Sequence, residues 1–268
     1  MAVDDEAARL ARALQLLHDT SLRRDGRARL SDLDATLDEL AFGDADRRAI
    51  LASGARLGVY RALVRNNFGT TVFRLLPRTR TLVNQHFDDA FDDDFVVFLE
   101  APGPRSSLLR DVIFEAADAL DRAWAAREAM AAEWPRELLA LERARFAADV
   151  ALGPAPAEAV PTVDAGLRLG AAAGATLFAF THDVASALLA DDDDLTVPAK
   201  TPSHVAVSRD AADEVHITPI DESTFSVASS LMAGRTLGEA VIAANVAHDP
   251  RVASGLAALA AAGFFAAS

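Results

Sequence analysis

The sequence contains no cysteine, which excludes disulfide bonds and thiolate metal sites. It also has no apolar run that reaches the ~18 residues of a membrane-spanning helix. The first residues, Met-Ala-Val-Asp-Asp-Glu, are acidic and lack the basic-then-apolar order of a signal peptide. We therefore expect a cytoplasmic protein.

Cations are scarce in the second part of the chain. The formal net charge is −14 over 268 residues. Residues 1–150 hold 21 Arg and 26 Asp or Glu, giving −5, and residues 151–268 hold 5 Lys or Arg and 14 Asp or Glu, giving −9. Because nucleic-acid affinity depends largely on cations that neutralise phosphates, this composition argues against DNA binding by the second part.

No metal site with a specific ligand spacing is present. His86 and Asp89 have a spacing that could place two ligands on one helix face, but an exposed helical pair is the simpler interpretation. Asp191–Asp194 is acidic but lacks the glycine and terminal glutamate of a calcium loop, so we interpret it as a solvated loop. We expect no metal and no cofactor in this chain.

Catalytic motifs are absent as well. His182, Asp183 and Ser186 have the residue types of a catalytic triad, but adjacent residues cannot easily adopt its geometry and no nucleophile elbow is present. No glycine-rich phosphate loop occurs. We therefore expect a protein without catalytic residues of its own.

The first part of the chain has the pattern of an all-helical domain. Apolar residues recur at helical spacing and predict helices within residues 5–18, 33–40, 57–68, 107–124 and 133–152. The Gly153-Pro-Ala-Pro-Ala157 segment is the clearest linker. We therefore predict a helical domain at 1–152, a linker at 153–161 and an α+β domain at 162–268.

The last third predicts a winged-helix-like unit, a β-hairpin followed by three helices. Residues 204–208 and 214–218 alternate between apolar and polar side chains, and the short polar connection between them predicts a hairpin. Asp221 is a predicted N-cap and Gly234 a predicted helix stop. Thr236-Leu-Gly-Glu239 predicts a capping box, and Asp249-Pro250 predicts the start of a third helix.

A polar motif in the first part is a candidate interface. Its residues are Tyr60, Arg61, Arg65, Asn66 and Asn67. The alternative is a structural role, in an amphipathic helix with Tyr60 buried and the arginines solvated. Two asparagines near an aromatic residue are poor helix formers, which leaves interaction and structural bracing equally open.

The second hairpin strand is a candidate for peptide binding. His216 and Thr218 face away from Val215 and Ile217, and an edge strand has free main-chain groups that can pair with another strand. The alternative is an edge that the rest of the chain covers. The acidic surroundings suit a peptide with basic residues.

Several stretches resemble known families. Ser203–Arg209, Glu214–Ile220, Phe225 and Gly234–Ala240 resemble the PqqD-type RiPP recognition element, over about residues 203–266. Upstream, Tyr60-Arg61, Asn66-Asn67-Phe68, Leu76-Pro77, Pro102–Ser106 and Leu141-Glu142 resemble the helical domain of the HvfC/BufC/MbnC/TglI group. The resemblance covers about residues 45–266. It departs from the family pattern at the second asparagine and at Arg65.

The resemblance implies a non-catalytic partner of a multinuclear non-heme iron oxidative (MNIO) enzyme. Such a partner protein binds the leader of a ribosomal precursor peptide and presents it to the enzyme, which holds the iron. On this sequence the resemblance implies that the leader pairs with Glu214, Val215, His216, Ile217 and Thr218, and that Val252, Leu256 and Leu259 wall the groove. It implies that Tyr60, Arg61, Arg65, Asn66 and Asn67 contact the partner enzyme.

Two other functions would require features that the sequence lacks. A winged-helix transcriptional regulator would need cations on the third helix, which carries only Arg251. A stand-alone metal-dependent enzyme would need a ligand set that the sequence does not display. The first of these is the main alternative to peptide binding.

Overall fold

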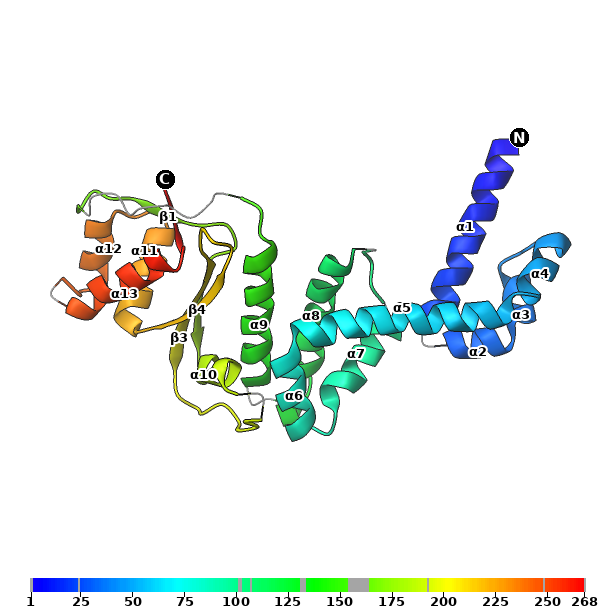
Figure 1. Cartoon of the computed structure of the whole chain (residues 1–268), viewed down its shortest axis with the longest axis horizontal. Coiled ribbons are helices and arrows are strands. Elements are labelled where there is room, and N and C mark those ends of the chain that lie inside the picture. The colour runs from blue at the N-terminus through cyan, green and yellow to red at the C-terminus, as the bar shows by residue number, and fades with distance from the viewer. Residues whose placement is uncertain are drawn as a thin grey trace. The chain divides into compact units, whose positions relative to one another are not determined.

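The computed structural model describes residues 2–23, 25–100, 103–106, 108–130, 134–153, 164–191, 193–247 and 249–267. The chain forms two compact units, which are described separately (Figure 1). The first contains Met1–Arg80 and Phe87–Ala123, and the second contains Thr81–His86 and Trp124–Ser268. No helix in the described ranges is long and apolar enough to cross a membrane.

The first unit is helical. Its helices are α1 (Ala2–Ser21), α2 (Gly26–Ser31), α3 (Leu33–Glu39), α4 (Asp44–Leu51), α5 (Gly54–Leu75), the start of α6 (Pro77–His86), α7 (Ala90–Glu100) and most of α8 (Leu109–Ala125). Pro77 begins α6 because proline suits the first turn of a helix and not its interior. Asp88 and Asp89 both have positive φ, which separates α6 from α7.

The second unit combines helices with two small antiparallel sheets. Its elements after α6 are η1 (Glu128–Met130), α9 (Trp134–Val150), β1 (Leu169–Ala171), β2 (Thr176–Phe180), α10 (Val184–Leu189), β3 (Ser203–Arg209), β4 (Val215–Ile220), α11 (Glu222–Met232), α12 (Leu237–Ala243), α13 (Pro250–Ala261) and β5 (Phe265–Ala267). One sheet has the order β2-β3-β4 and the other pairs β1 with β5.

Local capping signals set the helix boundaries of the winged-helix-like part, as predicted. The Asp221 side chain accepts from the Thr224 N–H and begins α11. Gly234 has φ +83 and ends it, with the N–H of Gly234 donating to the carbonyl of Leu231. The capping box of Thr236 at the start of α12 is present, and so is the Asp249-Pro250 start of α13.

The three-stranded sheet has helices on both faces. Figure 1 shows α9 on one side of β3 and β4, and α11 and α13 on the other. Arg209 on β3 donates to the carbonyls of Asp149 and Ala151 at the end of α9, at 2.7 and 2.8 Å. The side chain of Ala206 points to the opposite face of the sheet from Arg209 and packs into the core with Val227 of α11. Coverage on both faces explains why β3 is buried along most of its length.

The α+β class is confirmed, with helices first and a hairpin with three helices at the end. The contacts divide the chain within α6 and at the end of α8, and α9 packs with the second unit. Residues 154–161 of the predicted linker lie outside the described residues. The domain boundary at 153–161 therefore stays a prediction.

Candidate functional site

The strand β4 lies at the edge of its sheet, and among the described residues it pairs with β3 alone. In an antiparallel ladder, hydrogen-bonded residue pairs alternate with non-hydrogen-bonded pairs. The N–H of Asp210 donates to the carbonyl of Glu214 at 2.9 Å, which fixes that alternation. The main-chain groups of Val215, Ile217 and Pro219 therefore face the open side of β4.

Proline at position 219 agrees with this assignment. Proline has no N–H to donate, so within sheets it occurs where the missing donor faces away from the neighbouring strand. The open side of β4 thus offers the N–H and C=O groups of Val215 and Ile217 and the C=O of Pro219. An added strand uses such groups for its main-chain hydrogen bonds.

The remaining residues of the predicted binding strand have other main-chain partners. Glu214 lies in the turn before β4, and its N–H donates to the Asp210 carboxylate at 2.9 Å. By the same alternation, the main-chain groups of His216 and Thr218 face β3. Their side chains lie on the face of the sheet towards α11 and α13. The predicted alternation of side chains along this strand is therefore present, but only part of its main chain is open.

A groove of about 810 Å³ lies between the end of β4 and α13. Its lining residues are Pro219, Ile220, Asp221, Pro250, Arg251, Ser254, Gly255 and Ala258. At the other end of α13, the Ala262 carbonyl accepts from the hydroxyl of Ser208 on β3 at 2.7 Å. The helix therefore lies against one face of the sheet, with its N-terminus beside the end of β4 and its C-terminus against the central strand β3.

The predicted wall residues lie on a different side of α13. Val252 and Leu259 are 5% and 0% exposed and belong to the core. Leu256 is half-buried and lines a separate pocket of about 370 Å³. The side of α13 that faces the groove carries Arg251, Ser254, Gly255 and Ala258. The helical spacing of apolar residues identified the side of α13 that packs into the core. The small residues Ser254, Gly255 and Ala258, which lie on another side of the helix, could have indicated the groove.

The separate pocket is almost entirely apolar. Its lining residues come from α12, α13 and the segments around β1 and β5: Leu167, Leu169, Leu237, Val241, Val246, Ala247, Asp249, Val252, Ala253, Leu256, Ala257, Ala260 and Phe265. Asp249 supplies the one charged side chain in this set, and it already pairs with Arg251. The pocket suits an apolar group, and its lining offers no polar anchor that would orient one.

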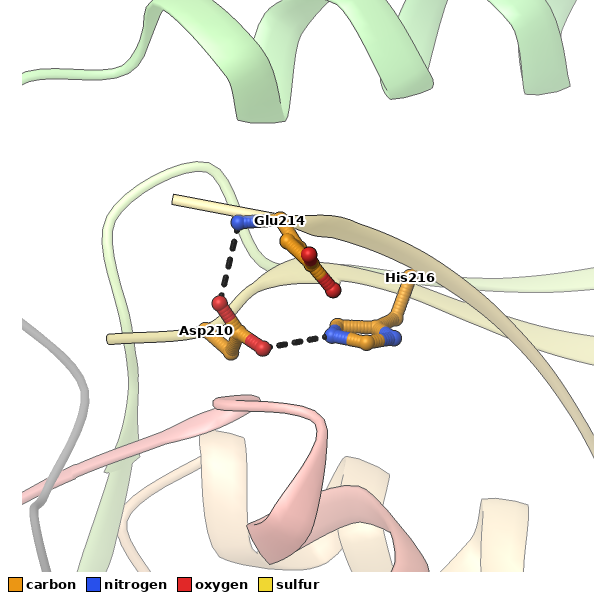
Figure 2. Close-up of side chains that lie close together, drawn as sticks. All are labelled: Asp210, Glu214 and His216. Carbon is orange, nitrogen blue, oxygen red and sulfur yellow. Dashed lines mark hydrogen bonds and ion pairs between the residues drawn. The ribbon is translucent and has the colours of Figure 1, made fainter. Parts of the chain in front are cut away.

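Three side chains at the hairpin turn could supply metal ligands. Ligand atoms of Asp210, Glu214 and His216 lie within 4.8 Å of one another (Figure 2). Asp210 Oδ2 lies 2.8 Å from His216 Nε2, and Asp210 Oδ1 accepts from the N–H groups of Ala212 and Glu214. The His216 hydrogen bond and these N–H groups lower the pKa of Asp210. Both oxygens thus have partners within the hairpin, which gives Asp210 a structural role in closing the turn.

The other polar groups singled out in the sequence have structural partners. His182 is buried, and the Glu137 carboxylate of α9 accepts from its N–H at 3.1 Å and from the Thr181 N–H at 2.7 Å. Asp183 accepts from the Ser186 N–H at 3.1 Å and so caps α10. Asp183 and Ser186 thus form a helix cap, and His182 is hydrogen-bonded to α9. Their geometry is not that of a catalytic triad.

The two segments interpreted from the sequence as an exposed helical pair and a solvated loop each have a hydrogen-bond partner in the described residues. His86 Nε2 lies 2.8 Å from the carbonyl oxygen of Leu195, and Asp89 has positive φ after the end of α6. Asp192 lies outside the described residues, and the Asp194 side chain accepts from the Thr196 N–H at 2.9 Å. The latter contact is typical of a capped loop.

The predicted partner-interface residues lie on α5 of the first unit, and three of them are exposed. These are Tyr60, Asn66 and Asn67. Tyr60 is 44% exposed, and its neighbours Val59 and Leu63 are 61% and 56% exposed. The alternative of a buried Tyr60 is therefore wrong. Exposed apolar side chains grouped in this way are typical of surfaces that contact another protein.

Arg61 and Arg65 are half-buried and hold neighbouring helices together. The Arg61 guanidinium donates to the Thr20 carbonyl at the end of α1, at 2.8 Å. Arg65 forms an ion pair with Glu100 of α7, with 3.2 Å between Nη2 and Oε1. Burial, together with the Arg65 charge, lowers the pKa of Arg61. The expectation of solvated arginines is wrong, because these two side chains brace the first unit.

Comparison with known proteins adds no assignment to this geometry. The sequence matches no family model and no curated protein.

Proposed function

We propose that this chain binds an extended peptide segment by strand addition along β4, in the groove beside α13. The observation that carries the proposal is the register of the hairpin, which points the main chain of Val215 and Ile217 to the open side of the sheet. Main-chain hydrogen bonds would give affinity, and the groove of about 810 Å³ would receive side chains of the peptide.

The resemblance described above supports a more specific form of this proposal. The peptide would be the leader of a ribosomal precursor, and this chain would present it to a partner MNIO enzyme in the cytoplasm. Catalysis and iron would belong to the partner. The exposed residues Tyr60, Asn66 and Asn67 on α5 would contribute to the contact with that enzyme.

DNA binding by the winged-helix-like part is less well supported. α13 is the helix that would read bases, and its single cation is Arg251. Arg251 is held by Asp249, with distances of 3.0 and 2.8 Å between the guanidinium and the carboxylate. The one cation that α13 could offer to a DNA phosphate is therefore already paired with a carboxylate, on a unit that is acidic overall.

A matched pair of variants tests strand addition. Ile217→Pro removes an N–H that faces the open side, whereas Ile217→Ala removes the same side chain and keeps the N–H. His216→Pro is unsuitable for this test because the His216 N–H faces β3. With precursor peptides encoded by neighbouring reading frames, we expect Ile217→Pro to weaken binding roughly 10-fold or more beyond Ile217→Ala.

Fluorescence anisotropy of the labelled peptide gives both affinities, with and without the partner enzyme. Circular dichroism of both variants checks that the second unit remains folded. Equal binding by Ile217→Pro and Ile217→Ala would show that β4 does not pair with the peptide. Binding to duplex DNA that weakens steeply with salt would instead favour the regulator.

A further inference from the structure

The open edge of β4 changes character at Pro219, which is also the first β4 residue that lines the groove. On the open side, the N–H and C=O groups alternate regularly up to Ile217, but Pro219 supplies only a carbonyl. A peptide strand that continues past this point finds no further donor on β4. Its main-chain pairing is therefore short, and its next residues pass the start of α11 and α13.

Negative charge predominates where the peptide would leave the strand. Asp221 lines the groove against α13 and also an adjoining groove of about 440 Å³, which Asp183 and Glu222 line as well. Arg251 is the one lysine or arginine among the residues lining these two grooves; Asp249 pairs with it, and Asp221 lies close enough to help raise the pKa of Arg251. An extended segment in this groove therefore meets more carboxylates than cations just beyond Pro219, because Asp183, Asp221 and Glu222 share the surroundings of a single arginine.

Asp221 can keep its structural role without its charge. Its Oδ1 accepts from the N–H of Thr224 at 2.9 Å and its Oδ2 from the hydroxyl of Thr224 at 3.0 Å. These are N-cap contacts, and asparagine serves about as well as aspartate at an N-cap. Asp221→Asn therefore removes the charge and keeps the N-cap.

Resting on the proposed function, we propose that the bound peptide carries a lysine or arginine that pairs with Asp221, immediately beyond a short ladder that ends at Pro219. The ladder uses the main-chain groups of Val215 and Ile217. The cation then fixes the register of a strand that main-chain bonds alone would leave free to slide. The ligand class is an extended segment with a basic residue at one defined end.

Selection from a random-peptide display library on the full chain tests this proposal. We expect binders to share a lysine or arginine at one position relative to an alternating segment. For a selected peptide, replacing that cation with glutamine should weaken binding about fivefold. Asp221→Asn should weaken the cationic peptide by a similar factor and leave the glutamine peptide unchanged.

Asp164→Asn is the matched control. Its carboxylate is exposed and caps the Gly166 N–H at 2.7 Å, so the variant makes the same charge change away from the groove. It should leave both affinities unchanged. This inference would be overturned if the binders share no cation, or if replacing a shared cation weakens binding to Asp221→Asn as much as to the unaltered protein. Neither result would contradict strand addition. Binders that ignore Ile217→Pro, or a library without binders, would instead overturn the proposed function.

Discussion

Replacing Gly255 with alanine should push α13 away from α11 and destabilise the second unit. An added Cβ would lie 2.3 Å from Oγ1 and 2.6 Å from Cγ2 of Thr224. Thr224 is fully buried, and rotating its side chain would break the hydroxyl's hydrogen bond to Asp221. Overpacking of this kind costs up to about 3 kcal/mol, and the better helix propensity of alanine returns about 1 kcal/mol. We therefore expect a net loss of about 2 kcal/mol.

Gly58→Ala is the matched control, because it makes the same substitution in an exposed part of α5. Apart from its chain neighbours and the backbone of its own helix, no described atom lies within 4 Å of the position of its added Cβ. Here only the helix propensity changes, so we expect the first unit to gain about 1 kcal/mol. The same chemical change should thus have opposite signs in the two units.

Hydrogen–deuterium exchange, followed by mass spectrometry of peptic fragments, measures the two units separately. A single melting curve would not, since a chain with two compact units need not unfold in one step. A loss of about 2 kcal/mol corresponds to roughly 30-fold faster exchange in α11 and α13. Slower exchange there in Gly255→Ala would refute the close packing of the two helices. Adding Thr224→Ala should restore part of the stability, because it removes the clashing atoms.

Three further outcomes are expected. The lowered pKa of Asp210 means that its charged form stabilises the hairpin above about pH 4, and that this stabilisation is lost as the pH falls through the lowered value. Asp210→Asn should therefore flatten the acid dependence of exchange in β3 and β4, and an unchanged dependence would contradict this. Glu137→Ala should cost the second unit about 1–3 kcal/mol, measured as faster hydrogen exchange in α9 and α10, because it removes the shared acceptor of the Thr181 and His182 N–H groups. Glu137→Gln should cost less. Tyr60→Ala should change stability by less than about 0.5 kcal/mol yet reduce co-purification of the partner enzyme, whereas Arg61→Ala should cost the first unit about 1–3 kcal/mol. Equal hydrogen exchange of α1 and α5 in these two variants would argue against the bracing role.

Local signals were sufficient to predict the elements around the site. The N-cap at Asp221, the helix stop at Gly234 and the capping box at Thr236 each depend on interactions within a few residues. The alternation along β4 predicted which of its side chains share a face. For these features the sequence neighbours of a residue are also its structural neighbours.

The position of the groove depends on how α13 packs against the rest of the second unit, and local sequence patterns do not predict that packing. Apolar spacing identified Val252 and Leu259 as one face of α13, but whether that face meets the core or a ligand depends on how the helix packs. The direction of the main chain at Val215 follows from the register of the hairpin, which Asp210 and Glu214 fix. Which residues of α5 are exposed and which contact other helices likewise could not be predicted locally, because it depends on where α1 and α7 pack.

The most direct test of the account is amide hydrogen exchange of Val215 and Ile217, resolved by nuclear magnetic resonance, with and without a bound peptide. In the free protein both amides should exchange rapidly, because their N–H groups face the open side of β4. The amides of His216 and Thr218, which face β3, should already be protected. Bound peptide should protect Val215 and Ile217. Peptide binding that leaves both amides in rapid exchange would contradict strand addition at this edge.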